Sequence, residues 1–194
     1  MILDEIAAKT RERIEKRKQE IAPETIKAQA EKIAEKEKQQ GGFSFPFEQA
    51  LKKNGISFIC EVKKASPSKG VIAEDFPYLA IAKEYEAAGA SALSVLTEPY
   101  YFMGSDTYLK EIANQVQIPV LRKDFTVDEY MIYEAKVLGA SAVLLICAIL
   151  SDEELKRYAK IAQELGLSAL VEAHTEEEVQ RALNSGARII GVNN

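Results

Sequence analysis

The most regular feature of the sequence is a repeat of short apolar runs, each followed by a polar loop and then by a longer amphipathic segment. The runs are rich in β-branched side chains, which is typical of buried strands. They predict strands at residues 56–62, 92–97, 118–123, 142–148, 167–172 and 188–193. The amphipathic segments between them predict helices at residues 77–88, 106–115, 127–138, 151–165 and 175–185.

The order of these elements restricts the fold to the α/β class with a parallel sheet. A Gly-Ala-Ser turn recurs before two of the strands, at residues 89–91 and 139–141, as expected for a repeated strand-helix unit. Strands that alternate with helices pair in parallel through right-handed crossovers. The pattern is therefore compatible with a doubly wound sheet or a (β/α)8 barrel.

The first part of the chain has a different pattern. Residues 3–39 are strongly charged and carry only sparse isoleucines, which do not keep a heptad spacing, and Pro23 separates two helical pieces. We predict an N-terminal helical extension, residues 1–46, that lies over a neighbouring surface. Residues 47–194 are then predicted to form the strand-helix domain.

Composition limits the partners of the chain. Its 194 residues are 47% hydrophobic and 28% charged, which suits a globular protein with a sizeable core. The formal net charge is −5 and basic residues are interleaved with acidic ones, so we expect neither nucleic acid nor a membrane as partner. The start of the chain has no apolar signal-peptide core, and we expect a cytoplasmic protein.

The two cysteines give no sign of metal or disulfide chemistry. Cys60 and Cys147 both lie inside apolar runs, and neither belongs to a Cys-x-x-Cys or Cys/His spacing. We interpret both as buried free thiols and expect no metal site.

Polar side chains at the ends of the predicted strands favour the barrel. They are Glu61 and Lys63 in the first strand, Lys123 in the third, Glu172 in the fifth and Asn193 in the sixth. In a (β/α)8 barrel the carboxyl ends of all strands face one pocket, whereas a doubly wound sheet gathers its ligand groups at one switch point. The sequence also lacks the glycine-rich phosphate loops typical of nucleotide-binding sheets.

The same side chains form a plausible catalytic set. Each charge taken alone is better explained as a solvated loop residue or a structural ion pair. Around one axis, however, they would supply cations for an anionic substrate, an acid and a carboxylate base. His174, the only histidine, is interpreted as a surface or supporting residue.

Six motifs, in their order along the chain, are similar to those of a known family. They are EVKKASPSKG, SVLTEPYYFMGS, VLRKDF, LLICAIL, LVEAHT and IIGVNN. The chain resembles indole-3-glycerol-phosphate synthases of tryptophan biosynthesis over its whole length, the helical extension included. A sister barrel such as phosphoribosylanthranilate isomerase would explain neither the extension nor the first motif.

The resemblance implies a TIM (β/α)8-barrel fold and a carboxy-lyase activity that needs no cofactor or metal. Family members convert the phosphorylated substrate 1-(2-carboxyphenylamino)-1-deoxyribulose 5-phosphate to indole-3-glycerol phosphate by ring closure, decarboxylation and dehydration. By position in the motifs, Lys123 matches the general acid for ring closure and Glu172 the carboxylate that serves in dehydration. Lys63 matches a lysine that contacts the anionic groups of the substrate, and Glu61 matches its partner carboxylate.

Three further positions match residues that bind or border the substrate in the family. Asn193 matches an asparagine that positions the substrate, whereas Ser66 and Phe102 lie in loops that border the site. Either Lys63 or Lys123 could donate the first proton.

The sequence departs from the family pattern at its end. It stops after the sixth predicted strand, whereas the family continues with two further strand-helix units. We therefore expect an N-terminal barrel fragment with about six parallel strands. The alternative to an enzyme is a non-catalytic fragment whose open barrel edges self-associate or bind a complementing C-terminal piece.

Overall fold

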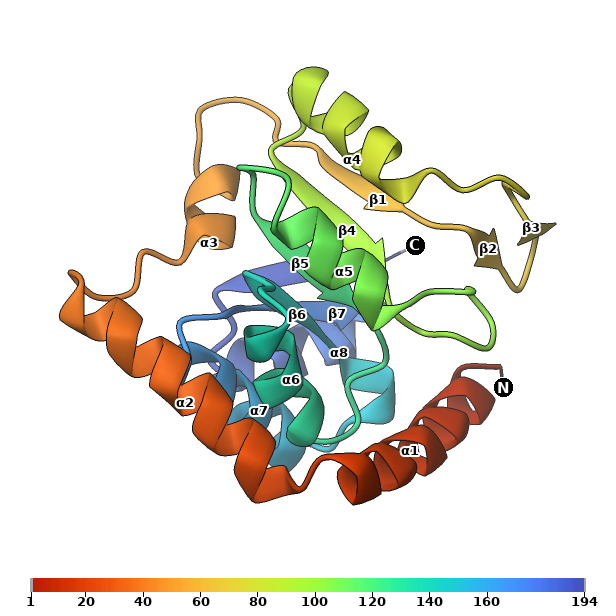
Figure 1. Cartoon of the computed structure of the whole chain (residues 1–194). Coiled ribbons are helices and arrows are strands. Elements are labelled where there is room, and N and C mark those ends of the chain that lie inside the picture. Colours follow the sequence, from red (N-terminus) through yellow and green to blue (C-terminus); the bar gives the residue numbers. More distant parts are fainter. Residues whose placement is uncertain (1, 194) are drawn as a thin grey trace.

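The computed structural model describes residues 2–193, so that Met1 and Asn194, the outer limits of the two predicted segments, lie outside the described residues. The main element is a parallel sheet of six strands (Figure 1). These are β1 (Ile59–Val62), β4 (Ala92–Leu96), β5 (Val120–Lys123), β6 (Ala142–Ile146), β7 (Ser168–Ala173) and β8 (Ile189–Val192).

The strand order identifies the sheet as part of a barrel. Neighbours follow the chain in the order β1-β4-β5-β6-β7-β8, and every adjacent pair is parallel. A doubly wound sheet would reverse its order at a switch point, and no reversal occurs in the described residues. The predicted fold class, a partial TIM barrel with six parallel strands, is confirmed.

Helices follow the strands and cover the outer face of the sheet (Figure 1). They are α4 (Tyr78–Ala87), α5 (Asp106–Ala113), α6 (Tyr130–Val137), α7 (Asp152–Glu164) and α8 (Glu176–Asn184). Ser151 and Thr175 cap α7 and α8, and Ser151 forms a full capping box with Glu154. α5 is capped by Ser105, whose side chain accepts a hydrogen bond from the backbone N–H of Thr107.

Several sequence predictions are corrected by the structure. The first strand begins at Ile59 and not at residue 56, because β1 is an edge strand with only one neighbour. The apolar run of β6 ends in a short 3-10 helix, η1 (Cys147–Ile149), and is not strand to residue 148. The turn after β1 contains an unpredicted hairpin of β2 (Ala65–Ser66) and β3 (Gly70–Val71). Cys147 is buried as predicted, but Cys60 is only half-buried.

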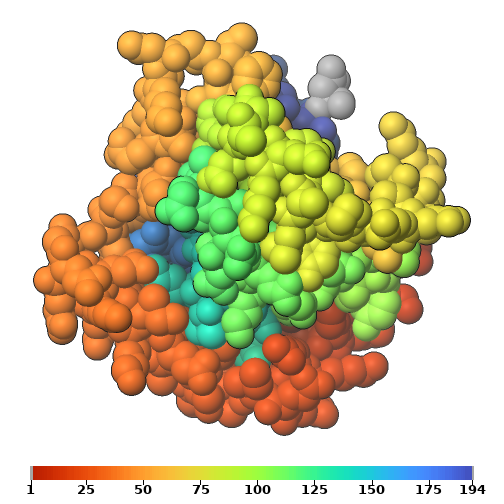
Figure 2. Space-filling model, turned by 45° about the horizontal axis from the view of Figure 1, so that its top comes forward, coloured from red at the N-terminus to blue at the C-terminus, as the bar shows by residue number. Residues whose placement is uncertain are grey.

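The helical extension consists of α1 (Ile2–Glu20) and α2 (Pro23–Gln39), and the break falls at Pro23 as predicted. The two helices lie along one side of the molecule, where Figure 2 shows them in red and orange. α2 packs mainly against α6. The sparse isoleucines face the core, since Ile6, Ile14 and Ile26 are all buried. Their spacing therefore marks contact with the barrel and not with a partner helix.

A second, smaller core closes the amino-terminal end of the sheet. The short helix α3 (Pro46–Leu51) inserts Phe47, which is 0% exposed, among Ala92, Leu121 and Ala142 from three strands. These residues lie on the concave face of the sheet. The polar side chains at the opposite, carboxyl ends of the strands are therefore free to line a cavity.

Candidate active site

A cavity of about 360 Å³ opens at the carboxyl ends of the strands. Residues from α1, the loops and all six strands or their ends contribute to its wall. The lining residues are Ile2, Leu3, Ile6, Glu61, Lys63, Pro67, Leu96, Phe102, Lys123, Asp124, Phe125, Leu144, Ile146, Glu172, His174 and Asn193.

A chain of alternating charges crosses this cavity. Nζ of Lys63 lies 2.5 Å from Oε1 of Glu61, and Nζ of Lys123 lies 4.0 Å from Oε2 of the same carboxylate. On its other side, Nζ of Lys123 is 3.8 Å from Oε2 of Glu172. The central ammonium group thus lies between two carboxylates that come from different strands.

The curvature of the sheet brings these groups together. β1 and β5 are separated by β4, and β5 and β7 are separated by β6. In a flat sheet, strands two places apart are about 10 Å from one another and their side chains run parallel. Curling turns the side chains of the concave face inward, so that Glu61, Lys123 and Glu172 approach one another.

Glu172 has two further polar neighbours. Its Oε1 accepts a hydrogen bond of 3.2 Å from Nδ2 of Asn193, at the end of β8. Nε2 of His174 is 3.5 Å from the same oxygen, and the backbone N–H of His174 donates to Glu178. His174 therefore lies on the cavity wall beside Glu172 and is more than a surface residue.

The remaining wall is apolar. Phe102 and Phe125 face each other across loop segments, with ring centroids 6.0 Å apart. Leu144 and Ile146 of β6 form the floor. Such a wall, next to lysines and carboxylates, suits a ligand that carries an aromatic ring and anionic groups.

The cavity contains most of the predicted site residues. Ser66 is the exception, because it is buried in β2 and its Oγ accepts a hydrogen bond of 3.3 Å from the backbone N–H of Lys69. Its chain neighbour Pro67 lines the cavity instead. Ser66 thus shapes the turn that borders the site.

Behind Lys123 lies a buried charged network that was not predicted from the sequence. Arg122 is only 3% exposed, and its guanidinium group lies 2.8 Å from carboxylates of both Asp106 and Glu134. Its Nε donates to Oγ1 of Thr97. Burial alone would raise the pKa of Glu134, but the adjacent guanidinium groups of Arg122 and Arg17 lower it.

Asp124 connects this network to the cavity and to α1. Its carboxylate accepts hydrogen bonds of 2.8 and 2.9 Å from Nη2 of Arg13 and of 2.6 Å from Oγ1 of Thr97. Arg122 projects from the face of β5 opposite to Lys123, and its carboxylate partners come from α5 and α6, the helices that flank β5 in the chain. Arg13, the partner of Asp124, comes from a distant part of the chain. The only sign of this network in the sequence is the run of three charged residues, RKD, at one strand end.

Within residues 2–193, no group of three or more His, Cys, Asp or Glu side chains is arranged to hold a metal ion. In the same range, no helix combines the length and the apolar composition needed to cross a membrane.

Sequential parallel strands with a polar cluster at their carboxyl ends define the class of (β/α)-barrel enzymes. Within that class, residues 3–194 match the family model described as indole-3-glycerol phosphate synthase. The chain belongs to this family, whose members act in tryptophan biosynthesis.

Curated relatives agree with the family model. The chain is 58% identical over 194 residues to the indole-3-glycerol phosphate synthase of Ruminiclostridium cellulolyticum, covering 100% of this chain and 72% of the relative. It is 57% identical to the enzyme of the same name from Endomicrobium trichonymphae, covering 100% of this chain and 73% of that one.

Among solved structures, the chain is similar in fold to methylornithine synthase, with a TM-score of 0.54. The match covers 89% of this chain and 64% of that one, at 10% sequence identity. At this identity the likeness concerns the fold alone.

Proposed function

We propose that the cavity binds 1-(2-carboxyphenylamino)-1-deoxyribulose 5-phosphate and that the protein acts on it as a carboxy-lyase. In this reaction the ring carbon that bears the carboxylate attacks the ketone carbon, carbon dioxide leaves, and water is then lost to give indole-3-glycerol phosphate. The observation that carries the proposal is the position of Lys123 between Glu61 and Glu172, next to an aromatic wall.

Lys123 is proposed as the general acid of ring closure. As the new carbon–carbon bond forms, negative charge develops on the ketone oxygen, and a positioned ammonium group can deliver a proton to it. The two flanking carboxylates keep this ammonium group on the axis of the cavity. Because its side chain is 30% exposed, it is open to a ligand.

Glu172 is proposed to stabilise the positive charge that develops on the substrate nitrogen and to take up a proton during dehydration. Its side chain is only 14% exposed, and Asn193 holds one of its oxygens. A carboxylate fixed in this way keeps its orientation through the reaction, which lowers the cost of reorganisation in the transition state.

The remaining residues are proposed to bind the substrate. Lys63, paired with Glu61, would contact its anionic groups, and Asn193 would position it. Phe102 would pack against the aromatic ring, since its own ring lies on the cavity wall. Ser66 would act through the turn that it stabilises.

Substitution of Lys123 tests the proposal. In the full-length protein, Lys123→Ala should lower kcat by about 10² to 10⁴, because an acid that acts on the ketone oxygen contributes mainly in the transition state. KM should change much less. The fluorescence of the indole product gives both constants.

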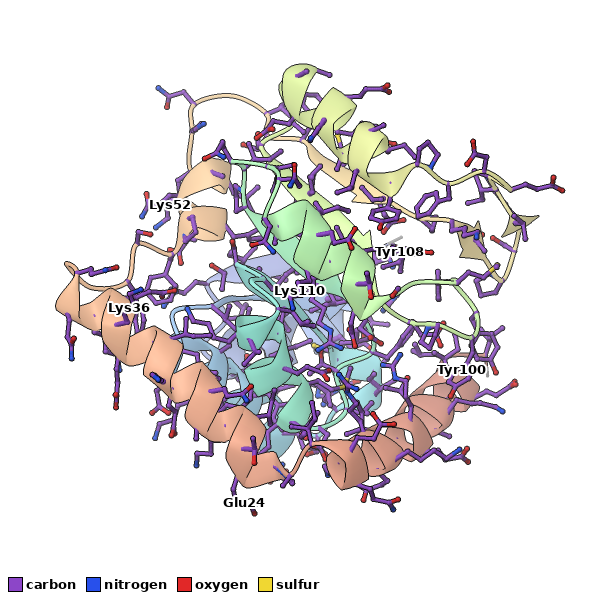
Figure 3. The ribbon with its side chains drawn as sticks, viewed as in Figure 1. Glu24, Lys36, Lys52, Tyr100, Tyr108 and Lys110 are labelled. Atoms are coloured by element: carbon purple, nitrogen blue, oxygen red, sulfur yellow. The ribbon has the colours of Figure 1, made fainter. Side chains whose placement is uncertain are left out.

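Lys110→Ala is the matched control, because Lys110 is an exposed lysine of α5 (Figure 3). It should leave both constants unchanged. If Lys123→Ala raised KM while kcat was preserved, Lys123 would be a binding residue and Lys63 the better acid. A fully active variant would refute the assignment of the site.

A further inference from the structure

The loop between β4 and α5 is built around one buried carboxylate, that of Glu98, which is 0% exposed. Its Oε1 accepts a hydrogen bond of 2.9 Å from the backbone N–H of Tyr100. Its Oε2 accepts two more, of 2.7 Å from Tyr101 and 3.0 Å from Phe102. Three successive amides therefore point at one side chain.

Within the part of the chain that the structure describes, the partners of this carboxylate are backbone amides. No basic side chain in residues 2–193 forms a salt bridge with Glu98, in contrast to the buried carboxylates of the Arg122 network. A buried anion is costly unless it is fully hydrogen-bonded, and amides converging on it can supply that compensation. The amides of the loop are thus the groups that make the buried charge tolerable, and the charge in turn fixes the loop.

The main chain of the loop is closed at its base as well. The N–H of Gly104 donates to the carbonyl oxygen of Glu98 at 2.8 Å. A Cβ atom on Gly104 would lie 2.5 Å from the carbonyl oxygen of Leu96, so that only glycine fits there. Met103 has a φ of 51°, a left-handed conformation that non-glycine residues adopt rarely.

The loop joins three parts of the cavity wall. The carbonyl oxygen of Phe102 accepts a hydrogen bond of 3.3 Å from the N–H of Ala65 in β2, and the ring of Phe102 faces Phe125. On the other side, Tyr101 donates from its hydroxyl to Glu5 of α1. Figure 3 shows Tyr100 beside the N-terminal part of α1, where Nζ of Lys9 lies 5.9 Å from its ring.

We infer that Glu98 is a positioning residue for the reaction: it holds Phe102 against the substrate without touching the substrate itself. The inference rests on the proposed function of the cavity. A carboxylate is required because three N–H groups approach two different oxygens. A glutamine would present an NH2 group in place of one oxygen, so that at least one loop amide would face a donor.

Glu98→Gln in the full-length protein is the primary test. We expect kcat/KM to fall by about 10- to 100-fold, mainly through KM, because misplacing a contact residue by about 1 Å has effects of this size. Glu86→Gln is the matched control. The carboxylate of Glu86 also accepts two loop amides, from Gln117 and Ile118, but at the opposite end of the sheet. Both amides donate to one oxygen, Oε1, which glutamine retains, so Glu86→Gln should leave kcat and KM unchanged.

A double-mutant cycle with Phe102→Ala separates positioning from general stabilisation. If Glu98 acts through Phe102, adding Glu98→Gln to Phe102→Ala should raise KM by less than about twofold further. The inference is overturned if Glu98→Gln lowers the melting temperature with kcat and KM unchanged. Full additivity of the two substitutions would overturn it as well.

Two further variants make the outcome decisive. If Glu98→Gln does not fold, Glu98→Asp enters the same cycle, because it keeps the buried charge but its shorter side chain cannot reach all three amides. Lys123→Ala shows whether the site itself is assigned correctly. An inactive Lys123→Ala together with an unaffected Glu98→Gln would refute the positioning role alone.

Discussion

At the residue scale, two cationic side chains on opposite faces of β5 have different surroundings. Lys123 points into the cavity and lies near carboxylates at 3.8 and 4.0 Å, without a short hydrogen bond to either. Arg122 points toward the outer face of the sheet, and all three nitrogens of its guanidinium group donate hydrogen bonds. The first arrangement leaves a cation available to a ligand, and the second fixes the strand end from which that cation projects.

Glu172→Gln tests the other half of the proposed acid-base pair. The substitution keeps the shape of the side chain and an oxygen that can accept from Asn193, but it removes the negative charge beside Lys123. In the full-length protein we expect kcat to fall by about 10² or more, with a smaller change in KM. Steady-state kinetics provide the comparison, and an unchanged kcat would transfer the base role to Glu61.

At the element scale, α3 contributes to the stability of the fold and lies away from the proposed catalytic residues. It closes the amino-terminal end of the sheet, opposite the cavity, and Phe47 is its fully buried anchor. Substitutions in this helix should therefore lower the stability of the protein without lowering its activity.

Phe47→Ala should lower the free energy of unfolding by about 3 to 5 kcal/mol, the usual cost of removing a buried aromatic ring. Urea unfolding followed by circular dichroism measures this change. At a temperature where the variant is folded, kcat should stay close to that of the unaltered protein. A large loss of kcat in the folded variant would show that α3 also shapes the cavity.

The pH dependence of stability should report on the next residue of α3, Glu48. Its carboxylate lies 2.7 Å from Nζ of Lys52 and 2.7 Å from Nε of Arg188. Hydrogen bonds from Lys52 and then Arg188 lower the pKa of Glu48 by more than burial raises it. A lowered pKa stabilises the fold above the unfolded value of about 4.3, and this contribution disappears as the pH falls through the folded value.

Glu48→Gln should therefore destabilise the protein by about 1 kcal/mol at pH 7 and by less at pH 3. Urea unfolding of both proteins across this pH range gives the difference. A difference that stayed constant or grew toward pH 3 would contradict the assignment.

At the scale of the whole molecule, the sheet has two open edges. β1 and β8 each have only one neighbour in the described residues. Near these edges Ile56, Phe58 and Val192 are 84%, 64% and 71% exposed. Open parallel edges with apolar side chains pair readily with other chains.

A polypeptide restricted to residues 1–194 should accordingly self-associate and turn over substrate poorly. Light scattering after size exclusion and the fluorescence assay measure the two properties. Adding a separately produced segment that corresponds to the remaining part of the Ruminiclostridium cellulolyticum relative should raise the activity. A monomer that is fully active by itself would contradict this prediction.

Local patterns in the sequence determined most of the architecture. Periodicity alone separates strands from helices, and the polar residues that end the strands favour a barrel, because both signals arise between residues close together in the chain. The motifs likewise indicated the family and the residues that line the cavity. The bounds of β1 and the hairpin of β2 and β3 were less predictable, because they depend on which backbone segments pair with one another in the folded chain.

Only the tertiary structure decided which charges meet. The sequence contains Arg13, Arg122 and Asp124 without any sign that the first lies beside the last, because α1 packs on the barrel through contacts more than a hundred residues apart. Glu98 is likewise an ordinary loop glutamate in the sequence. Its role follows from a fold of the backbone that turns three amides toward one carboxylate, which no spacing of residue types encodes.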